Sequence, residues 1–304
     1  MQPINILGVG RTDYNPKPDI SIPEMVHRAV QAALADAGLT MKDVDARVTA
    51  SADLWDGLTA SNVAITEVVG AVMQPEARVA GDGLLAACHG AMSILAGAYN
   101  VVLVVAHCKS SMGDSDGITN WTFDPIFQQP LGLNDVAASA LQASTLSLAP
   151  PLPCPIADGA AAIILSHASP LPTPHLIGMG WALDEHYLGD RDLTDSPALR
   201  EAARRAYTLA DIDDPKRDIT FVELSDQFDY QRKLWASVLF GKTSEVAHTA
   251  KTSEVSARGV PPFVAGLDRL IEVVLRLRKE SGTALAHGCW GPCGQGQAVV
   301  VVRQ

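Results

Sequence analysis

Apolar residues along this chain fall into two alternating patterns. Short, nearly continuous apolar runs lack the alternation of a half-exposed strand, which is typical of strands covered on both faces. Between them, apolar residues recur at the spacing of amphipathic helices. The runs lie at 47–52, 100–106, 160–165, 176–182, 219–224, 283–287 and 298–302, and the helical patterns at 22–37, 60–72, 83–97, 197–210, 228–240 and 263–279. This rhythm predicts an α/β fold whose sheet is enclosed by helices.

The helix predicted at 22–37 has a signal at each end. Ser21 and Glu24 are spaced as in a capping box, and Gly38 follows the last apolar position. A serine side chain can accept a hydrogen bond from the first turn, and glycine readily takes the left-handed conformation that ends a helix. We therefore expect the helix to begin after Ser21 and to end before Gly38.

Two distant segments, 29–53 and 202–226, match each other in register. Each reads as a helix, an acidic loop, a buried strand and an aspartate. We interpret the match as an internal duplication; chance similarity between two α/β units of equal length is the alternative. Two similar halves packed face to face would bring the ends of their corresponding strands to one pocket. The matched pairs include Ala33 with Ala206, Ala37 with Ala210, and Asp53 with Asp226.

Segment 109–157 interrupts the rhythm. It carries six prolines and has a helical pattern at 134–146. Because proline removes a backbone donor and fixes the chain direction, we expect a loop or cap over the rest of this segment.

The charge balance narrows the range of partners. The 304 residues carry a net charge of -11, without a cluster of Lys and Arg. Nucleic acids and anionic membrane surfaces need such a cluster, so we expect neither as a partner; a locally bound, acidic CoA ester remains compatible. The chain has no signal-peptide features and no segment long enough to insert into a membrane, so we expect a cytoplasmic protein.

The five cysteines are an odd number and are scattered along the chain, so reduced thiols are expected. His287, Cys289 and Cys293 lie close together in the sequence but have no fourth ligand nearby. We therefore expect no metal site and no bound cofactor, with a CoA thioester entering as a substrate.

Four segments carry a resemblance to a known family. They are CPIADGAAAIIL (154–165), VELSDQF (222–228), ARGVPPFVAGLDRL (257–270) and GPCGQGQAVVVV (291–302). In this order they resemble the thiolase superfamily over nearly the whole chain, and most closely its sterol-carrier or lipid-transfer branch, which is similar to acetyl-CoA acetyltransferases. The resemblance implies a duplicated thiolase fold with five αβαβα layers, a homodimer and acyl-CoA chemistry.

The resemblance also implies a division of the chain. The N-terminal thiolase half covers 1–108, and a shortened loop or cap segment covers 109–157. Residues 158–182 supply strands that complete the N-terminal half and enter the second, and the C-terminal half covers 183–304. The loop segment is shorter than the loop domain with which the family covers CoA, so less surface is left to hold CoA.

The family's nucleophile is a cysteine at the start of a buried helix, where the helix dipole favours a thiolate. Counting back from the strand at 98–107, its position falls on Ala80, followed by Gly-Asp-Gly. Cys88 lies eight residues later, about 12 Å along a helix axis. We interpret Cys88 as a small buried hydrophobe and expect the nucleophile to be missing.

Both histidine positions of the family are also replaced. Ser225 and Asp226 stand where the branch has a His-Asp pair, and Val260 stands where it has the histidine of Gly-His-Pro. Loss of a nucleophile or its base costs on the order of 10³ to 10⁶ in turnover. Ordinary thiolysis is therefore not expected.

Three residues are left as candidates for catalysis. Cys289 stands near the position of the family's second cysteine, with Cys293 as the competing choice and simple packing beneath a turn as the alternative for both. Asp226 and Tyr230 are four residues apart, so on a helix they could share one face for general acid–base work, unless both are merely solvated.

Candidate substrate-binding residues accompany them. Asp82 stands beside Ala80, either as an N-cap or as a catalytic carboxylate. Gly291, Gly294 and Gly296 could let backbone N–H groups approach a thioester oxygen or a phosphate.

Four functions fit these observations. The first is a degenerate thiolase-like subunit of an acyl-CoA-processing complex, which in related systems pairs with a small OB-fold, zinc-ribbon protein. The second is a C–C lyase, a retro-aldolase acting on a β-hydroxyacyl-CoA, which needs an acid–base pair and an oxyanion hole but no thiolate. The third is residual acyl transfer through Cys289 or Cys293, and the fourth is a non-catalytic scaffold. We favour the first, with the lyase as runner-up.

Overall fold

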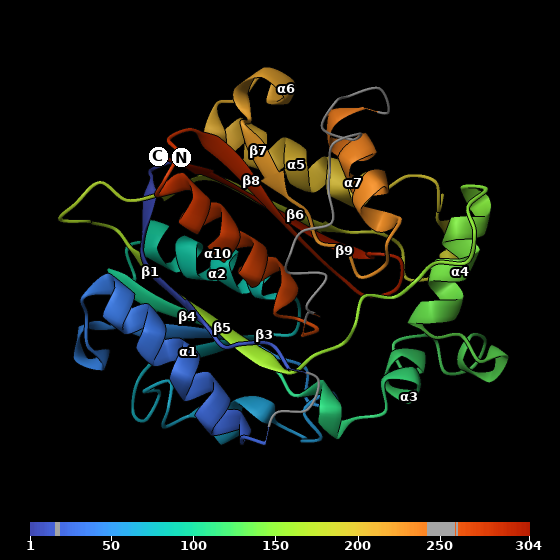
Figure 1. Ribbon diagram of the computed structural model, residues 1–304, viewed down its shortest axis with the longest axis horizontal. Coiled ribbons are helices and arrows are strands. Elements are labelled where there is room, and N and C mark those ends of the chain that lie inside the picture. Colours follow the sequence, from blue (N-terminus) through green and yellow to red (C-terminus); the bar gives the residue numbers. More distant parts are fainter. Residues whose placement is uncertain (16–18, 242–258, 260) are drawn as a thin grey trace.

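The computed structural model describes residues 1–15, 19–241, 259 and 261–304, which form one mixed sheet and the helices that cover it (Figure 1). The strands are β1 (Ile4–Arg11), β2 (Ala46–Ala50), β3 (Glu76–Val79), β4 (Val101–Cys108), β5 (Gly159–Ser166), β6 (His175–Leu183), β7 (Phe221–Glu223), β8 (Thr283–Trp290) and β9 (Gly296–Arg303). The α-helices are α1 (Ile22–Ala37), α2 (Gly83–Leu95), α3 (Ser115–Asn120), α4 (Asp135–Thr145), α5 (Pro197–Ala210), α6 (Pro215–Asp218), α7 (Gln231–Phe240) and α10 (Ala265–Leu277). Short 3-10 helices are η1 (Met41–Asp43), η2 (Ser61–Ile65), η3 (Ser110–Met112), η4 (Gln129–Leu131) and η5 (Leu188–Asp190).

The strand order divides the sheet into two matching halves. The strands follow the order β3-β2-β4-β5-β1-β6-β9-β8-β7. Two residue pairs join β1 to β6, Ile4 with Leu176 and Asn5 with His175. On either side of this join the order is the same, β1-β5-β4-β2 on one side and β6-β9-β8-β7 on the other, with β3 as an additional edge strand.

Figure 1 shows five stacked layers. α1 packs on the outer face of the first half-sheet, α2 and α10 lie between the two half-sheets, and α5 and α7 cover the outer face of the second. The apolar side chains separate accordingly into one large central cluster and one cluster under each outer helix layer. This is the five-layer αβαβα arrangement expected from the sequence.

The two halves repeat one close contact between strand and helix. A Cβ on Gly8 of β1 would lie 2.2 Å from the carbonyl oxygen of Ala33 on α1, and a Cβ on Gly178 of β6 would lie 2.1 Å from that of Ala206 on α5. Glycines at Gly10 and Gly180 repeat the contact one turn earlier along each helix. Since Ala33 and Ala206 are matched in the sequence, the structure confirms the duplication.

Most predicted elements are confirmed to within three residues at each end. The helix at 22–37 spans those residues; Ser21 Oγ accepts the Glu24 N–H at 3.3 Å, and Gly38 is left-handed with φ 65°. The helix predicted at 60–72 is wrong, because Ser61–Ile65 forms a 3-10 helix followed by turns. That stretch is rich in β-branched residues, which restrict their own side chains in an α-helix.

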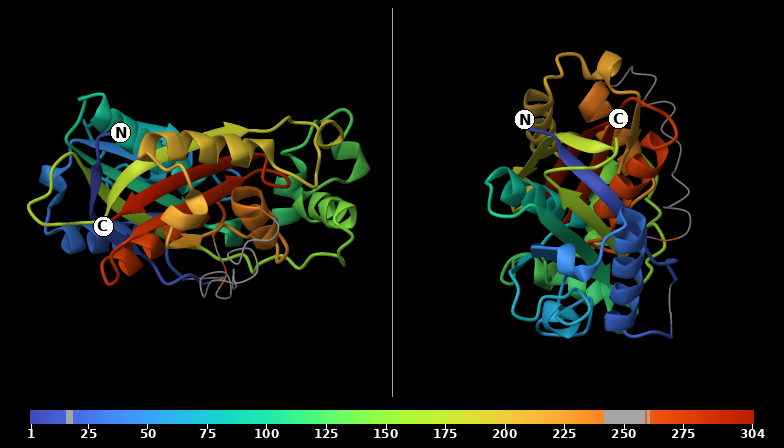
Figure 2. Two further views of the ribbon diagram at one scale, coloured as in Figure 1. Left: turned by 90° about the horizontal axis from the view of Figure 1, so that it is seen from above. Right: turned by 90° about the vertical axis from the view of Figure 1, so that its left-hand side faces the viewer.

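Segment 109–157, here named the cap, lies at the end of the molecule opposite the two termini (Figures 1 and 2). Its base is fastened by the buried Asp158, whose Oδ1 accepts hydrogen bonds from Ser110 Oγ at 3.0 Å and the Ser111 N–H at 2.8 Å. No helix in the described ranges is long and apolar enough to cross a membrane. Residence in the cytoplasm stays a prediction.

Candidate functional site

A cavity of about 340 Å³ lies where both halves meet the cap. Its body wall comes from the turn before α2, the segment after β7, the start of α10 and the loop between β8 and β9. Its cap wall comes from α3, the start of α4 and the proline-rich stretch 153–156. The cavity therefore gathers the strand ends of both halves, as duplication predicts.

A buried ion pair forms the charged part of the body wall. Arg269 donates from Nη2 to Asp226 Oδ1 at 2.7 Å and from Nε to the Leu224 carbonyl oxygen at 3.1 Å. The Arg269 side chain is fully buried, and that of Asp226 is 3% exposed. Burial acts to lower the pKa of Arg269, but Asp226 and Asp268 outweigh it and raise the pKa. The guanidinium is thus charged and held in a fixed orientation.

The positions predicted to have lost their catalytic groups meet at this cavity. Ala80 and Ser225 both line it, whereas Val260 lies outside the described residues. One thiol also lines it: Cys154 donates from Sγ to the Asp226 carbonyl oxygen at 3.0 Å. Burial and then the charge of Asp226 raise the pKa of Cys154 to about 11. Among the lining residues that the structure describes, none carries an imidazole.

Asp82 ties the two central helices together. Its Oδ1 accepts the Leu84 N–H at 2.8 Å, and its Oδ2 accepts the Gly266 N–H at 3.0 Å. Burial raises the pKa of Asp82 to about 7, against the opposing effect of these two hydrogen bonds. The N-cap interpretation of Asp82 is confirmed, and its carboxyl group lies outside the cavity wall.

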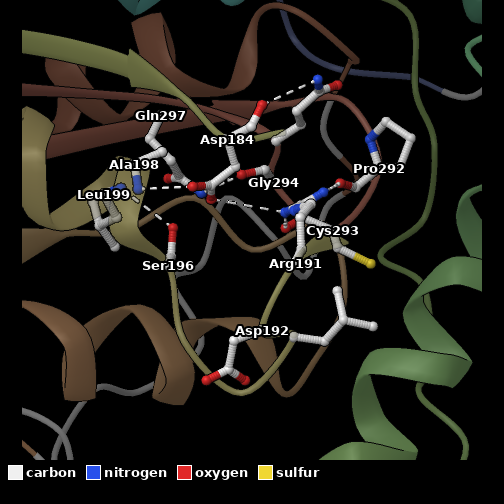
Figure 3. A network of polar contacts seen from close by, with 12 residues as sticks. Asp184, Arg191, Asp192, Ser196, Ala198, Leu199, Pro292, Cys293, Gly294 and Gln297 are labelled. Atoms are coloured by element: carbon white, nitrogen blue, oxygen red, sulfur yellow. Dashed lines mark hydrogen bonds and ion pairs between the residues drawn. The ribbon is translucent and has the colours of Figure 1, made fainter. Parts of the chain in front are cut away.

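The loop between β8 and β9 is held from the second half. Arg191 donates to the carbonyl oxygens of Pro292 at 2.8 Å and Cys293 at 3.0 Å, and Gln297 Nε2 donates to that of Gly294 at 2.7 Å (Figure 3). The Cys293 thiol points towards α4. Because several of its carbonyl groups are anchored, this loop presents a defined surface to the cavity at Gly291.

Known proteins resemble the chain in sequence and in structure. No protein-family model matches it. It is 26% identical to an acetyl-CoA acetyltransferase of Methanothermobacter thermautotrophicus, over 95% of this chain and 94% of that protein. It also superimposes on human mitochondrial 3-ketoacyl-CoA thiolase with a TM-score of 0.77 at 15% identity, over 100% of this chain and 99% of that one. The chain belongs to the thiolase superfamily.

Two further solved structures share this thiolase fold. One is an Ltp2-ChsH2(DUF35) aldolase, with a TM-score of 0.76 at 19% identity over 99% of this chain and 98% of that one. The other is a monomeric SCP2-thiolase-like protein of type 1 from Mycobacterium smegmatis, with a TM-score of 0.68 at 17% identity over 99% of this chain and 77% of that one. Identities this low establish the fold alone.

Within the thiolase fold, Cys289 lies in β8 and does not line the cavity. Burial raises its pKa to about 12, although the Ser225 hydroxyl acts to lower it. On the same strand, His287 accepts the Ser225 N–H at Nδ1 (3.2 Å) and donates from Nε2 to Gln297 Oε1 (2.6 Å). Burial lowers the pKa of His287 to about 4. The Cys289 thiol and the His287 imidazole are therefore both neutral at pH 7. A separate finding is that the described ranges contain no cluster of three or more His, Cys, Asp or Glu residues that could hold a metal ion.

The prediction that Asp226 and Tyr230 share a helical face is wrong. α7 begins at Gln231, so the two residues lie on a non-helical stretch. The Tyr230 hydroxyl donates to Gln142 Oε1 on α4 at 2.6 Å, and burial raises the Tyr230 pKa. The structure brings Asp226 to the cavity, whereas Tyr230 joins the body to the cap.

Of the three glycines predicted to bind substrate, Gly291 lines the cavity. A Cβ on Gly294 would lie 2.9 Å from the ring of Trp235, and one on Gly296 would lie 2.1 Å from the ring of Trp290. In the observed arrangement these two glycines make room for indole rings. Trp290 itself lines the cavity, near Gly81 in the turn before α2.

The polar residues of the wall that sequence reasoning missed include Arg269, Cys154 and Asp135. Arg269 left a usable signal, because it does not follow the four-residue spacing of the other charged residues of α10, which are Asp268, Glu272 and Arg276. Buried charges of this kind need partners, and partners of buried charges often lie at functional sites. Cys154 and Asp135 come from the cap, and the helical pattern at 134–146 does not indicate which of its residues reach the cavity.

Proposed function

We propose that this chain is a thiolase-fold subunit that processes an acyl-CoA without thiolysis. The observation that supports the proposal is that Ala80, the residue to which the resemblance assigns the position of the nucleophilic thiol, lines the cavity. The one thiol found on the described wall, Cys154, has a raised pKa and is protonated at neutral pH. Since the thiolate is the nucleophile, neither position supports acyl transfer.

Thiolysis itself tests this proposal. The purified chain, alone and with its partner, should form no acetyl-CoA from acetoacetyl-CoA and CoA. Ala80→Cys should not restore the reaction, because the resemblance assigns the position of the neighbouring imidazole to Ser225. Acetyl-CoA formation by the unaltered chain would overturn the proposal.

The proposal includes two kinds of association. One structural neighbour is described as an Ltp2-ChsH2(DUF35) aldolase, and we extend such a pairing to this chain with a small OB-fold, zinc-ribbon protein. A homodimer has support from edge strand β3, beside which Met73 is 96% exposed and Val63 64% exposed. Co-purification with the product of the adjacent reading frame, followed by mass measurement of the complex, tests both associations.

The lyase is the second candidate because a specific arrangement favours it. Asp226, Arg269 and Ser225 line one cavity, and residues of these types can offer a carboxylate, a fixed positive charge and a hydrogen-bond donor. An aldolase is also among the structural neighbours. A β-hydroxyacyl-CoA should release an aldehyde or ketone when mixed with the chain and its partner; absence of product, with and without the partner, would discard the lyase.

Residual acyl transfer through Cys289 and a purely structural role have less support. Cys289 is 2% exposed and is not part of the cavity wall, and a scaffold would not require a cavity lined by a buried ion pair. We also propose the division into 1–108, 109–157, 158–182 and 183–304. It has support from β4, which ends at Cys108, and β5, which begins at Gly159.

A further inference from the structure

The cap contributes a carboxyl group to the cavity that no other described residue satisfies. Asp135, the first residue of α4, lines the cavity. Its Oδ1 atom is buried and has no hydrogen-bond partner in the described part of the chain. A buried acceptor left without a donor costs free energy, so such a group calls for an explanation.

Helix capping does not supply that explanation. Asn134 is the N-cap of α4, and its Oδ1 accepts the Ala137 N–H at 2.8 Å. The Asp135 N–H donates to Thr119 Oγ1 at 3.3 Å, which fixes the backbone of Asp135 against α3. The Asp135 carboxyl group is therefore positioned on the cavity wall without serving the helix end.

The other two carboxyl groups of the cavity wall differ from that of Asp135 in their surroundings. Asp226 is paired with Arg269 at 2.7 Å, and Asp116 on α3 is exposed to solvent. The chain has no Lys, Arg or His between Ser110 and Ser166, so the cap brings no positive charge to this wall. A phosphate or carboxylate would be repelled there, whereas a hydroxyl group could donate to Asp135.

We propose that Asp135 accepts the hydrogen bond of a hydroxyl group on the acyl chain of the bound thioester and, in lyase turnover, accepts its proton. The inference rests on the proposed function, because it takes an acyl thioester as the ligand. In the cleavage step the β-hydroxyl proton passes to the Asp135 carboxylate, the C–O bond becomes a carbonyl, and the bond between the α and β carbons breaks. Its electron pair forms the thioester enolate, which is then protonated at the α carbon, so that an aldehyde or ketone and a shortened acyl thioester leave.

The electrostatic setting suits this role. Burial raises the pKa of Asp135 to about 6, so the carboxylate form predominates just above that pH and is a stronger base than an ordinary aspartate. The other titratable or charged groups of the wall or near Asp135 are Asp116 on α3, Cys154 in the cap, Asp226 after β7, Arg269 on α10 and Cys293 in the β8–β9 loop. Since Arg269 is already paired with Asp226, Asp135 keeps no cation of its own on the described wall.

Calorimetric titration with two ligands tests the inference. The chain with its partner is titrated with 3-hydroxybutyryl-CoA and with butyryl-CoA, which differ by one hydroxyl group. We expect tighter binding of the hydroxylated ligand by about ten-fold or more, as a hydrogen bond to a charged group provides. Asp135→Asn should abolish most of that difference, and Asp116→Asn, altered at an exposed carboxylate of the same wall, should keep it.

The outcomes distinguish a failure of the proposed acyl-CoA function from a failure of the role of Asp135. If the unaltered protein binds neither ligand, the proposed acyl-CoA function fails. If it binds both equally, or if Asp135→Asn keeps the preference, the acyl-CoA function stands and the role of Asp135 is refuted. Should Asp135→Asn fail to fold, the unaltered protein still decides: its preference for the hydroxylated ligand should rise with pH around a midpoint of about 6, and a preference independent of pH would refute the role.

Discussion

The two halves of the molecule each place an aspartate three residues beyond a matching strand, and each aspartate pairs with an arginine of its own half. After β2, Asp53 pairs with Arg78 at 2.7 Å, and both side chains are about one quarter exposed at 27% and 25%. After β7, Asp226 pairs with Arg269 at the same distance, but the side chains are 3% and 0% exposed. The Asp53 carboxylate also accepts the Ser61 N–H at 2.8 Å and so supports a surface loop. One inherited position thus serves a loop in the first half and a cavity wall in the second.

The largest expected difference between the halves comes from removing each arginine. Arg269→Met removes the positive charge that is paired with the buried Asp226 carboxylate, which costs about 3–5 kcal/mol of unfolding free energy. Arg78→Met breaks the more exposed pair and should cost less than about 1 kcal/mol. Urea unfolding followed by circular dichroism measures both. Equal losses would show that burial does not distinguish the two pairs, and Asp226→Asn added to Arg269→Met should recover part of the larger loss.

A second comparison tests whether the halves are equivalent in their cores. Gly8→Ala and Gly178→Ala each place a Cβ within 2.2 Å of a helix carbonyl oxygen, so strand and helix must separate at a cost of about 3 kcal/mol or more. Gly189→Ala is the matched control, because a Cβ there meets no atom within 4 Å, and its effect should stay within about 0.5 kcal/mol. Thermal unfolding of the three variants measures these losses of stability. If alanine were tolerated in one of the strands β1 and β6 but not in the other, the two halves would not be equivalent in their strand–helix packing.

The contact between the halves at Asp82 should appear as a dependence of stability on pH. The pKa of Asp82 is raised from its ordinary value of 3.8 to about 7, so the folded state binds this proton more tightly than the unfolded chain. The stabilisation is complete below about pH 4 and is lost as the pH rises to about 7. Asp82→Asn should lower the unfolding free energy at every pH. One of the two accepting oxygens becomes an amide NH2 group, so the N–H of Gly266 or of Leu84 faces another donor and loses its acceptor. The contribution of Asp82 to the change of unfolding free energy with pH between pH 4 and 7 should disappear in that variant. If the variant keeps the same pH dependence as the unaltered protein, the raised pKa of Asp82 is refuted.

The duplication and most elements could be predicted from the sequence because they depend on local patterns, whereas the five layers were implied by the resemblance. Apolar runs mark strands covered on both faces, and Ser21 and Gly38 mark the ends of α1. β1 was not predicted, since Gly8 and Gly10 weaken a strand signal; their reason, contact with α1, is a matter of packing. The cavity was anticipated at Ala80, Ser225 and Asp226 from the resemblance. Asp135 and Cys154 reach it through the folding of the cap, where the helical pattern at 134–146 predicts a helix but not its place against the body.

The smallest expected effect concerns the thiols and distinguishes the cap from the two halves of the body. Cys154 is half-buried with a pKa of about 11, whereas Cys88 of the first half and Cys289 of the second are buried with pKa values of about 12. Iodoacetamide should therefore modify Cys154 first, although slowly, because little of any thiol is ionised at pH 7. Peptide mass spectrometry measures the order of labelling, and Cys154→Ala should remove the first modified peptide with little change in stability. Cys289→Ala serves as the control and should leave the labelling of Cys154 unchanged. Faster modification of Cys289 than of Cys154 would place a reactive thiol in the second half and return acyl transfer through Cys289 to the leading position.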